Sequence, residues 1–425
     1  MKMLRNILFF LCLLVYTIAD GQDAQIELKI DELAAAIEPK LIEWRRDFHQ
    51  HPELSGQEFR TAQKVAEHLR ALGLDVQTGI AKTGVVAILR GQNPTPVVAL
   101  RSDMDALPIT ENTGLPFASK VKAVKNGDSV GVMHACGHDT HTAILMSVAQ
   151  ILVQLKDKIP GTVKFIFQPA EEAAGGADEM VAAGVLENPN VDAIIALHIS
   201  SQIRVGEIHY RSGGFMASSD YFNIIVTGKQ THGAMPWLGT DPIVVSAQIV
   251  LGLQNIISRQ IDVTQAPALI TIGKIHGGVR SNIIPGKVEL AGTIRALDEK
   301  MRLEIHEKVR VTATNIAESA GATADVRIRQ GTPVLHNNVV LCTKLLPSLV
   351  SVVGQDKVIQ TNASTVSEDF AFFLSNTPGF YFLIGGMPPD ASRENAPAHH
   401  SSDFKIDESG MLIGVRALCQ LVMEY

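Results

Sequence analysis

Residues 142–168 read TAILMSVAQILVQLKDKIPGTVKFIFQ, and this stretch decides the fold class. Its first part, residues 142–155, has the apolar spacing and the length of a helix, and Pro160 and Gly161 close the segment behind it. Its second part, residues 163–168, is a short apolar run typical of a buried strand. Similar runs at 85–89, 97–101 and 193–198 lie among helical patterns, so we expect an α/β domain with a mostly parallel sheet.

A different pattern occupies residues 213–330. Helical segments at 242–260 and 299–320 are set among four strand-like runs, at 221–226, 268–276, 288–295 and 324–328. The order βαββαβ is that of a ferredoxin-like unit. Because the earlier alternation resumes beyond it, we predict an α/β domain in two parts, 22–212 and 331–425, interrupted by an inserted α+β domain at 213–330.

The amino terminus has the pattern of an export signal. Lys2 and Arg5 precede an apolar stretch at 7–18, and the small residues Ala19 and Gly21 follow it. A membrane anchor is the alternative, but this stretch is shorter than the roughly 20 residues that span a bilayer. We therefore interpret residues 1–21 as a signal peptide, without a stable membrane span after its removal, and expect a secreted or periplasmic protein.

Composition narrows the function classes. The chain has 425 residues, of which 46% are hydrophobic and 19% charged, as in ordinary globular protein. A net charge of -7 without a long basic run argues against a nucleic-acid partner. Outside the signal, Cys136, Cys342 and Cys419 are too few and too widely spaced for a disulfide scaffold.

Four short segments carry metal-ligating residue types. Cys136 and His138 flank Gly137 just before a predicted helix, and Glu171 and Glu172 follow a strand after Pro169. The others are His198 at the end of the 193–198 run, and the pair His399 and His400 near the carboxyl terminus.

Each segment alone has a plainer interpretation: a chance Cys–His pair, a solvated acidic loop, or a histidine of the core. Together they supply five metal ligands at loop or strand ends, where an open α/β sheet places its active site. These are Cys136, His138, Glu172, His198 and one of the two terminal histidines. Five ligands exceed the need of one tetrahedral ion, which favours two ions sharing a bridging water.

The sequence resembles the dinuclear metallopeptidases that include aminoacylase, acetylornithine deacetylase and glutamate carboxypeptidase. Three stretches carry the resemblance: RDFHQHPELS at 46–55, RSDMDALP at 101–108 and CGHD at 136–139. They are most similar to the amidohydrolase branch, with its hippurate hydrolases and auxin–amino-acid conjugate hydrolases. The resemblance implies a lid or dimerisation role for the inserted domain. It also implies a metal-ligand set of Cys136, His138, Glu172, His198 and His400.

The resemblance assigns further roles. His400 is chosen over His399 because it stands four residues before the aromatic Phe404. Asp103 and Asp105 would support the metal site without binding metal, since this chain has an Asp at 103 where peptidase branches have a histidine. Here the alternative is that both aspartates cap a strand end.

The implied activity is hydrolysis of the amide bond of small N-acyl amino acids, by a metal-bridging water with Glu171 as general base. His232 would help to hold the oxyanion, often from the partner subunit in relatives, and Asn282 and Arg295 would clamp the substrate carboxylate. The cofactors would be two divalent ions, manganese or zinc, with cobalt or nickel as further options. A homodimer is compatible with this scheme. The alternative function is a metallo-exopeptidase, either a dipeptidase or a carboxypeptidase.

Overall fold

The computed structural model describes the backbone of residues 2–125, 127–173 and 175–425, and side chains from residue 24 onward within those ranges. It has two compact units: unit 1 comprises Met1–Tyr210, Val339–Gln360 and Thr377–Tyr425, and unit 2 comprises Arg211–Asn338 and Thr361–Asn376. The predicted signal peptide, residues 1–21, lies outside the described side chains. Among the described residues, no helix combines the length and the apolar character that crossing a membrane requires.

Unit 1 is built on a sheet whose centre is parallel, as predicted. In the described chain its eight strands run in the order β1-β2-β6-β3-β7-β18-β8-β17. The central strands β6, β3, β7 and β18 are mutually parallel. β1 pairs antiparallel with β2, β2 with β6 and β8 with β18, whereas β17 pairs parallel with β8. The strand bounds are β1 Asp75–Ile80, β2 Gly84–Arg90, β3 Val97–Asp103, β6 Thr162–Gln168, β7 Ala193–Arg204, β8 Ile208–Tyr210, β17 Val358–Gln360 and β18 Gly379–Met387.

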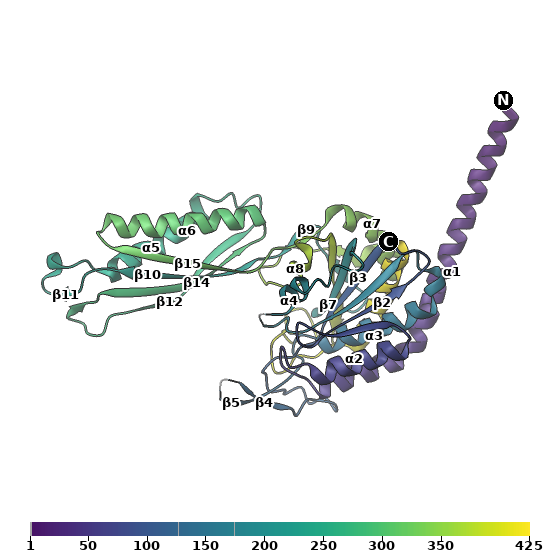
Figure 1. The fold of residues 1–425 in the computed structure, drawn as a ribbon, viewed down its shortest axis with the longest axis horizontal. Helices are drawn as coiled ribbons and strands as arrows, with labels where there is room; N and C mark the ends of the chain where they lie inside the picture. Colours follow the sequence, from purple (N-terminus) through teal and green to yellow (C-terminus); the bar gives the residue numbers. More distant parts are fainter. Residues whose placement is uncertain (1, 126, 174) are drawn as a thin grey trace. The chain divides into compact units, whose positions relative to one another are not determined.

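Helices and a hairpin complete unit 1 (Figure 1). Their bounds are α1 Lys2–Gln50, α2 Phe59–Ala71, α3 His138–Gln154, α4 Ala177–Ala182, α7 Val339–Val353 and α9 Met411–Glu424, with the hairpin β4 Lys122–Lys125 and β5 Asp128–Gly131. α3 packs against strand β3 and against both α1 and α9. Its residues 138–149 are all buried: the first turn is polar and faces the cluster of acidic and histidine side chains, and residues 143–149 are apolar apart from Ser147. The core therefore fixes the start of α3 firmly.

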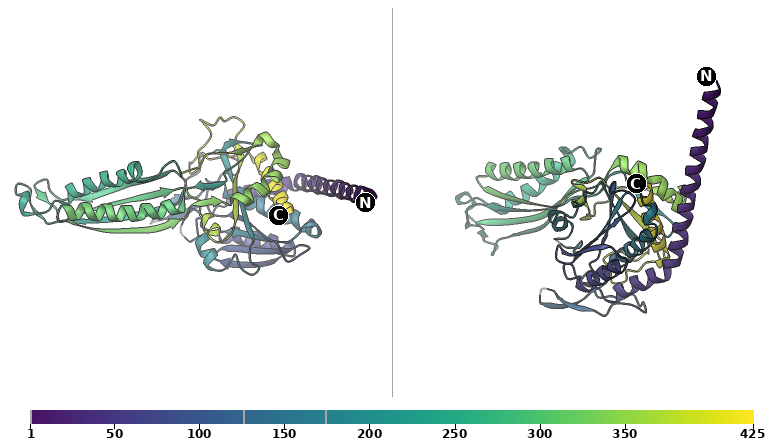
Figure 2. Two further views of the ribbon diagram at one scale, coloured as in Figure 1. Left: turned by 90° about the horizontal axis from the view of Figure 1, so that it is seen from above. Right: turned by 45° about the vertical axis from the view of Figure 1, so that its right-hand side comes forward.

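Unit 2 has the predicted chain order βαββαβ. Strands β10 Ser219–Thr227, β12 Ala268–Gly277, β14 Lys287–Ala296 and β15 Thr323–Thr332 form an antiparallel sheet in the order β12-β14-β10-β15. Helices α5 Pro242–Arg259 and α6 Glu299–Ser319 lie along one face of this sheet (Figures 1 and 2). The short strands are β9 Gly213–Met216, β11 Thr231–His232, β13 Ile283–Ile284 and β16 Leu335–Asn337, and α8 spans Ala371–Leu374.

The boundaries of unit 2 differ from the predicted 213–330. Residues 331–338 and 361–376 were assigned to the second part of the α/β domain, but they belong to unit 2. Strand β16 pairs with β9, and the amide of Ala217 donates to the carbonyl of Ser364 at 3.1 Å. These long-range backbone hydrogen bonds leave no pattern in the local sequence. The sequence therefore could not predict that residues 361–376 belong to unit 2.

A buried ion cluster fixes one end of unit 2. Asp220 of β10 accepts hydrogen bonds from Arg302 Nε at 2.8 Å and His306 Nε2 at 2.7 Å, both on α6. Its other oxygen accepts from the amide of Gly331 at 2.9 Å. Burial alone would raise the pKa of Asp220, but the hydrogen bonds from Arg302 and His306 lower it to about 2.

We expect this carboxylate to make unit 2 sensitive to acid. The pKa of Asp220 in the folded chain lies below the unfolded value of about 3.9, so its ionised carboxylate stabilises unit 2 above pH 4. This stabilisation, about 2 kcal/mol, is lost as pH falls toward 2. Urea unfolding at pH 6 and pH 3 measures it. Asp220→Asn should cost about 3–5 kcal/mol at pH 6, because Arg302 is left buried beside a neutral group, and should flatten the pH dependence. An unchanged pH slope in this variant would contradict the assignment.

Candidate metal centre

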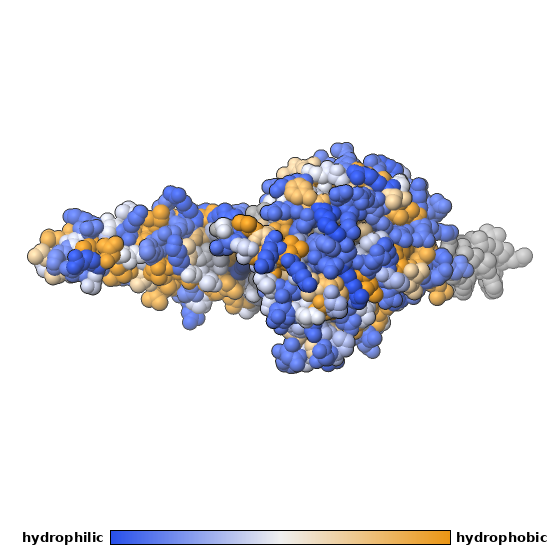
Figure 3. Space-filling view, turned by 90° about the horizontal axis from the view of Figure 1, so that it is seen from below, coloured by the Kyte–Doolittle hydropathy of each residue, from blue (hydrophilic) through white to orange (hydrophobic). Residues whose placement is uncertain are grey.

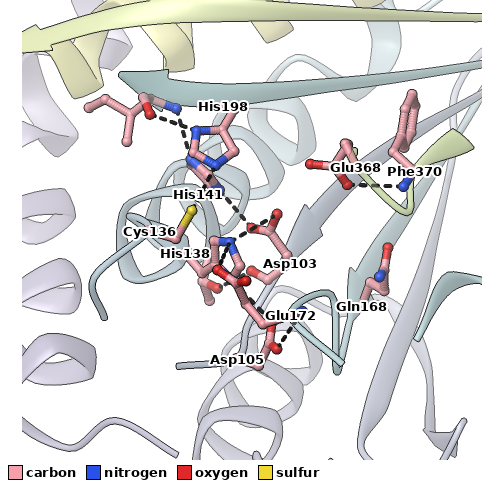
Figure 4. Close-up of polar contacts among 12 residues, drawn as sticks. Asp103, Asp105, Cys136, His138, His141, Gln168, Glu172, His198, Glu368 and Phe370 are labelled. Carbon is pink, nitrogen blue, oxygen red and sulfur yellow. Dashed lines mark hydrogen bonds and ion pairs between the residues drawn. The ribbon is translucent and has the colours of Figure 1, made fainter. Parts of the chain in front are cut away.

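Four of the predicted metal ligands, Cys136, His138, Glu172 and His198, converge beyond the carboxyl ends of the parallel strands of unit 1 (Figure 4). Glu172 follows β6, and His198 lies on β7 after its pairing with β3 has ended at Ala196. Cys136 and His138 come from the turn into α3. The prediction that His198 ends its strand is wrong, because β7 extends beyond its pairing with β3 and continues to Arg204.

Gly137 shapes the turn between Cys136 and His138. Its φ of +94° is a left-handed conformation that side chains rarely adopt. A Cβ at this position would lie 2.6 Å from Cγ2 of Ile199, so a larger residue would also clash. Glycine here allows the residues on both sides to face the same cluster.

Cys136 and His198 are direct neighbours. Sγ of Cys136 lies 3.4 Å from Nε2 of His198, while Nδ1 of His198 lies 2.6 Å from the carbonyl oxygen of Ile199. A proton on Nδ1 donates to that carbonyl and leaves the Nε2 lone pair facing the sulfur. Burial raises the pKa of the Cys136 thiol and lowers the pKa of His198. A bound cation would stabilise the thiolate against this burial.

His138 is held from behind. Its Nδ1 lies 3.1 Å from Oδ1 of Asp105, and the carboxylate requires a proton on that nitrogen. Nε2 is buried and has no hydrogen-bond partner among the described residues. It lies 3.7 Å from Oδ2 of Asp103 and 4.0 Å from Oε1 of Glu172. An imidazole nitrogen oriented in this way is suited to bind a metal ion.

Glu172 and His400 close the other side of the cluster. Nε2 of His400 lies 3.0 Å from Oε1 of Glu172, and this hydrogen bond raises the pKa of His400. His400 has a φ of +62°, and its amide donates to the carbonyl of Ala135 at 2.8 Å. The carboxyl-terminal segment is thus tied to the turn that carries Cys136.

His399 also reaches the cluster, which the sequence did not predict. Its Nδ1 lies 3.6 Å from Sγ of Cys136, and its Nε2 accepts from the amide of Ser201 at 3.4 Å. With Nε2 accepting, the proton is on Nδ1 and points to the sulfur. His399 packs its ring against Phe404 and is half-buried, whereas His400 keeps 53% of its side chain exposed. This arrangement makes His399 a donor to the thiolate and leaves ligation to His400.

The donor set fits a pair of divalent cations. Two groups share Cys136, one with His138 and His198 and one with Glu172 and His400; within each, the candidate ligand atoms lie within 4.8 Å of one another. A thiolate, imidazoles and a carboxylate suit zinc and other borderline divalent ions. Nε2 of His138 makes no hydrogen bond among the described residues and lies between the carboxylates of Asp103 and Glu172, an arrangement that favours a bound ion.

Asp103 and Asp105 both contact histidines of the cluster, and their supporting role stays a prediction. Asp105 lies on the Nδ1 side of His138, whereas Oδ2 of Asp103 lies 3.7 Å from its Nε2. Asp103 Oδ1 lies 2.6 Å from Nδ1 of His141, whose Nε2 accepts from the amide of Ile199 at 2.8 Å. With both nitrogens engaged, His141 orients its neighbours and does not bind metal. Burial opposes the charge of Asp103, but His138, His141 and Arg101 together hold its pKa well below the usual range.

Glu171 lies beside the ligands. A carboxylate oxygen of Glu171 is within 4.8 Å of the candidate ligand atoms of His138 and Glu172. A base at this distance can reach a water held in the cluster.

Of the three candidates of unit 2, His232 and Asn282 lie together and Arg295 lies apart from them. His232 on β11 pairs with Ile283 of β13, and the carbonyl of Asn282 accepts from the amide of Gly233 at 2.8 Å. Arg295 lies near the far end of β14, roughly 25 Å along the strand from its start at Lys287. Asn282 precedes that start, so Asn282 and Arg295 do not meet within one chain, and the expected clamp stays a prediction.

Comparisons with known proteins find relatives along most of the chain. Residues 99–424 match Peptidase family M20/M25/M40. The chain is 42% identical over 393 residues to "Thermostable carboxypeptidase 1" of Saccharolobus solfataricus, which covers 92% of this chain and 96% of that protein. It is 43% identical over 310 residues to the "N-acyl-L-amino acid amidohydrolase" of Geobacillus stearothermophilus, over 72% of this chain and 81% of that protein.

A solved structure matches over nearly the whole length. It is a dinuclear metal-binding peptidase of Bacillus subtilis, with a TM-score of 0.77 and 34% identity, and the match covers 92% of this chain and 98% of that one. These matches confirm the predicted resemblance and the mostly parallel α/β fold. The chain belongs to Peptidase family M20/M25/M40.

Proposed function

We propose that this protein is a metal-dependent amidohydrolase that removes the acyl group from N-acyl amino acids. The observation that carries the proposal is the convergence of Cys136, His138, Glu172, His198 and His400, with Glu171 beside them. The amidohydrolase relative at 43% identity supports the substrate class.

The residues divide the chemistry among them. Two divalent cations, when bound, polarise water and the amide carbonyl. Glu171 accepts the proton of the attacking water and returns it to the leaving nitrogen. His138 and His198 present their Nε2 lone pairs because Asp105 and the Ile199 carbonyl hold the opposite nitrogens.

Arg295 is the candidate that recognises the α-carboxylate. Its Nη1 is buried without a hydrogen-bond partner among the described residues. A buried guanidinium nitrogen lacking a partner is costly, and a substrate carboxylate would satisfy it. We therefore infer that the substrate keeps a carboxylate next to the scissile amide.

A panel of substrates tests the proposal. N-acetyl, N-benzoyl and indole-acetyl amino acids are assayed beside the matching amino-acid amides, which lack the carboxylate. We expect hydrolysis of the acids and a loss of at least about 10²-fold for the amides, since the pairing of Arg295 is lost. No hydrolysis of any N-acyl amino acid by the metal-loaded protein would sink the proposal.

An exopeptidase is the second candidate, because the relative at 42% identity is a carboxypeptidase. Both activities use the same metal centre and differ in the group that precedes the amide. Dipeptides in the same panel distinguish them: faster cleavage of dipeptides than of N-acyl amino acids favours the peptidase.

A homodimer would complete the site. His232 and Asn282 lie together on unit 2, and large apolar side chains near them are exposed, with Trp237 at 75% and Val279 at 88%. Figure 3 shows hydrophobic side chains on the surface of this unit. A second copy that covers such residues could bring the partner's His232 to the metal centre.

Mixed dimers test this assembly. Glu171→Gln and His232→Ala proteins should each be nearly inactive, but their random mixture should recover about a quarter of wild-type activity, because half of the symmetric dimers carry one complete site. The recovery is measured after co-refolding at equal concentrations. Activity no higher than the sum of the two variants would exclude contribution of His232 across an interface.

The metal and the location are parts of the same proposal. The thiolate and imidazole ligands favour zinc, and manganese is the alternative; metal analysis of the purified protein decides between them. Lys2, Arg5 and the apolar stretch at 7–18 support export, which amino-terminal sequencing of the secreted protein checks.

A further inference from the structure

A buried carboxylate outside the cluster reaches the loop that carries Glu171. Glu58, just before α2, is fully buried. Its Oε1 accepts hydrogen bonds from the amides of Gly56 at 2.7 Å and Ala170 at 3.0 Å. Its Oε2 accepts from the hydroxyl of Thr83 at 2.6 Å. All described contacts of Glu58 are therefore with donors, and one of them belongs to the residue preceding Glu171.

Ala170 has an unusual backbone conformation. Its φ is +54°, in the left-handed region that residues other than glycine seldom adopt. Such a conformation persists only where the surroundings hold it. The hydrogen bond from the Ala170 amide to Glu58 is a contact that holds it.

A second carboxylate fixes the other side of Glu171. The amide of Glu172 donates to Oδ2 of Asp105 at 3.0 Å, and the same oxygen accepts from the hydroxyl of Ser55 at 2.6 Å. Glu58 and Asp105 therefore hold the two amides that flank Glu171. Ser55 and Glu58 lie in one short segment, so this segment supports the loop on both sides.

We propose that Glu58 is a positioning residue for Glu171: its hydrogen bond to the Ala170 amide sets the direction in which the Glu171 side chain leaves the loop. The inference rests on the proposed role of Glu171 as general base. It assigns Glu58 a function in turnover although Glu58 contacts neither substrate nor metal.

Two variants separate the reach of the Glu58 side chain from its charge. Glu58→Gln keeps the length and an acceptor oxygen, whereas Glu58→Asp keeps the carboxylate but withdraws it by one methylene. Burial raises the pKa of Glu58, which agrees with a role that does not need the charge. We expect Gln to leave kcat within about threefold and Asp to lower it about 10–100-fold, with KM and metal content unchanged.

A measurement on the metal-free chain gives a readout besides activity. Hydrogen exchange of the Ala170 amide should be at least about tenfold faster in Glu58→Asp than in the wild type or in Glu58→Gln, since the hydrogen bond is lost. Exchange and kcat should change together.

Glu53→Ala is the matched control. Glu53 lies in the same segment and accepts from two amides, those of Arg60 at 3.0 Å and Thr61 at 2.8 Å, but these belong to α2. It should lower stability while leaving kcat within about threefold. A loss of kcat in this control equal to that of Glu58→Asp would overturn the proposal.

The remaining outcomes are also decisive. If Glu58→Asp keeps wild-type kcat while Glu171→Gln is inactive, the positioning role of Glu58 is wrong and the proposed function stands. If Glu58→Asp keeps the wild-type kcat and Glu58→Gln lowers it, the charge of Glu58 matters and the reach of its side chain does not, which also contradicts the positioning role. If Glu171→Gln is fully active, the proposed function itself fails.

Discussion

Glu171→Gln is expected to lower turnover of N-acyl amino acids by about 10²–10⁴-fold while both metal ions stay bound. The side chain keeps its size, and Glu171 is not one of the predicted ligands, although its carboxylate lies within 4.8 Å of the candidate ligand atoms of His138 and Glu172. What is lost is the carboxylate that accepts a proton from water and returns it to the leaving nitrogen. KM should change little, because the substrate carboxylate is bound elsewhere.

The measurement pairs steady-state kinetics with metal analysis. Glu179→Gln, on the exposed side of α4, removes the same charge close by in the sequence and should be neutral. Wild-type turnover in Glu171→Gln would exclude Glu171 as the base. Loss of metal together with activity would instead make Glu171 a ligand.

His400→Asn is expected to lower the metal content from two ions toward one and to reduce turnover about 10³-fold. Nε2 of His400 lies 3.0 Å from Glu172, and with Cys136 these residues form one of the two groups that could hold an ion. Asn is too short to replace the imidazole nitrogen. Equilibrium dialysis against zinc and manganese measures the loss.

His399→Asn is the comparison that makes this result specific. Nδ1 of His399 lies 3.6 Å from Sγ of Cys136, but its Nε2 already accepts a hydrogen bond from the amide of Ser201. It should keep both ions and lose only about tenfold in activity, as expected for a residue that orients a ligand. The reverse pattern, with metal lost in His399→Asn and kept in His400→Asn, would exchange the two roles.

The ligand residues could be predicted because they lie in short, recognisable segments. Cys136 and His138 are two residues apart, and Glu172 follows a strand after Pro169. The apolar runs of β3 and β6 are completely buried, so their pattern in the sequence is strong. The parallel arrangement then follows, because strands separated by helices return to the same edge of the sheet.

Other parts of the site could not be predicted. His399 and His400 are adjacent, and only the backbone bond from His400 to Ala135 decides which ring faces Glu172. Glu58 acts on a residue more than 100 positions away, through a single hydrogen bond to a backbone amide. Neither feature has a periodicity or a spacing from which it could be inferred.

The sequence by itself determined which residues carry metal-binding chemistry and which segments form the parallel sheet, because both depend on side-chain type and local periodicity. The tertiary structure alone decided the extent of unit 2, the separation of Asn282 from Arg295, and the support of Glu171 by Glu58 and Asp105. The physical reason is the same in each case. These features depend on hydrogen bonds and strand lengths that join distant segments, and such contacts form only when the chain has folded.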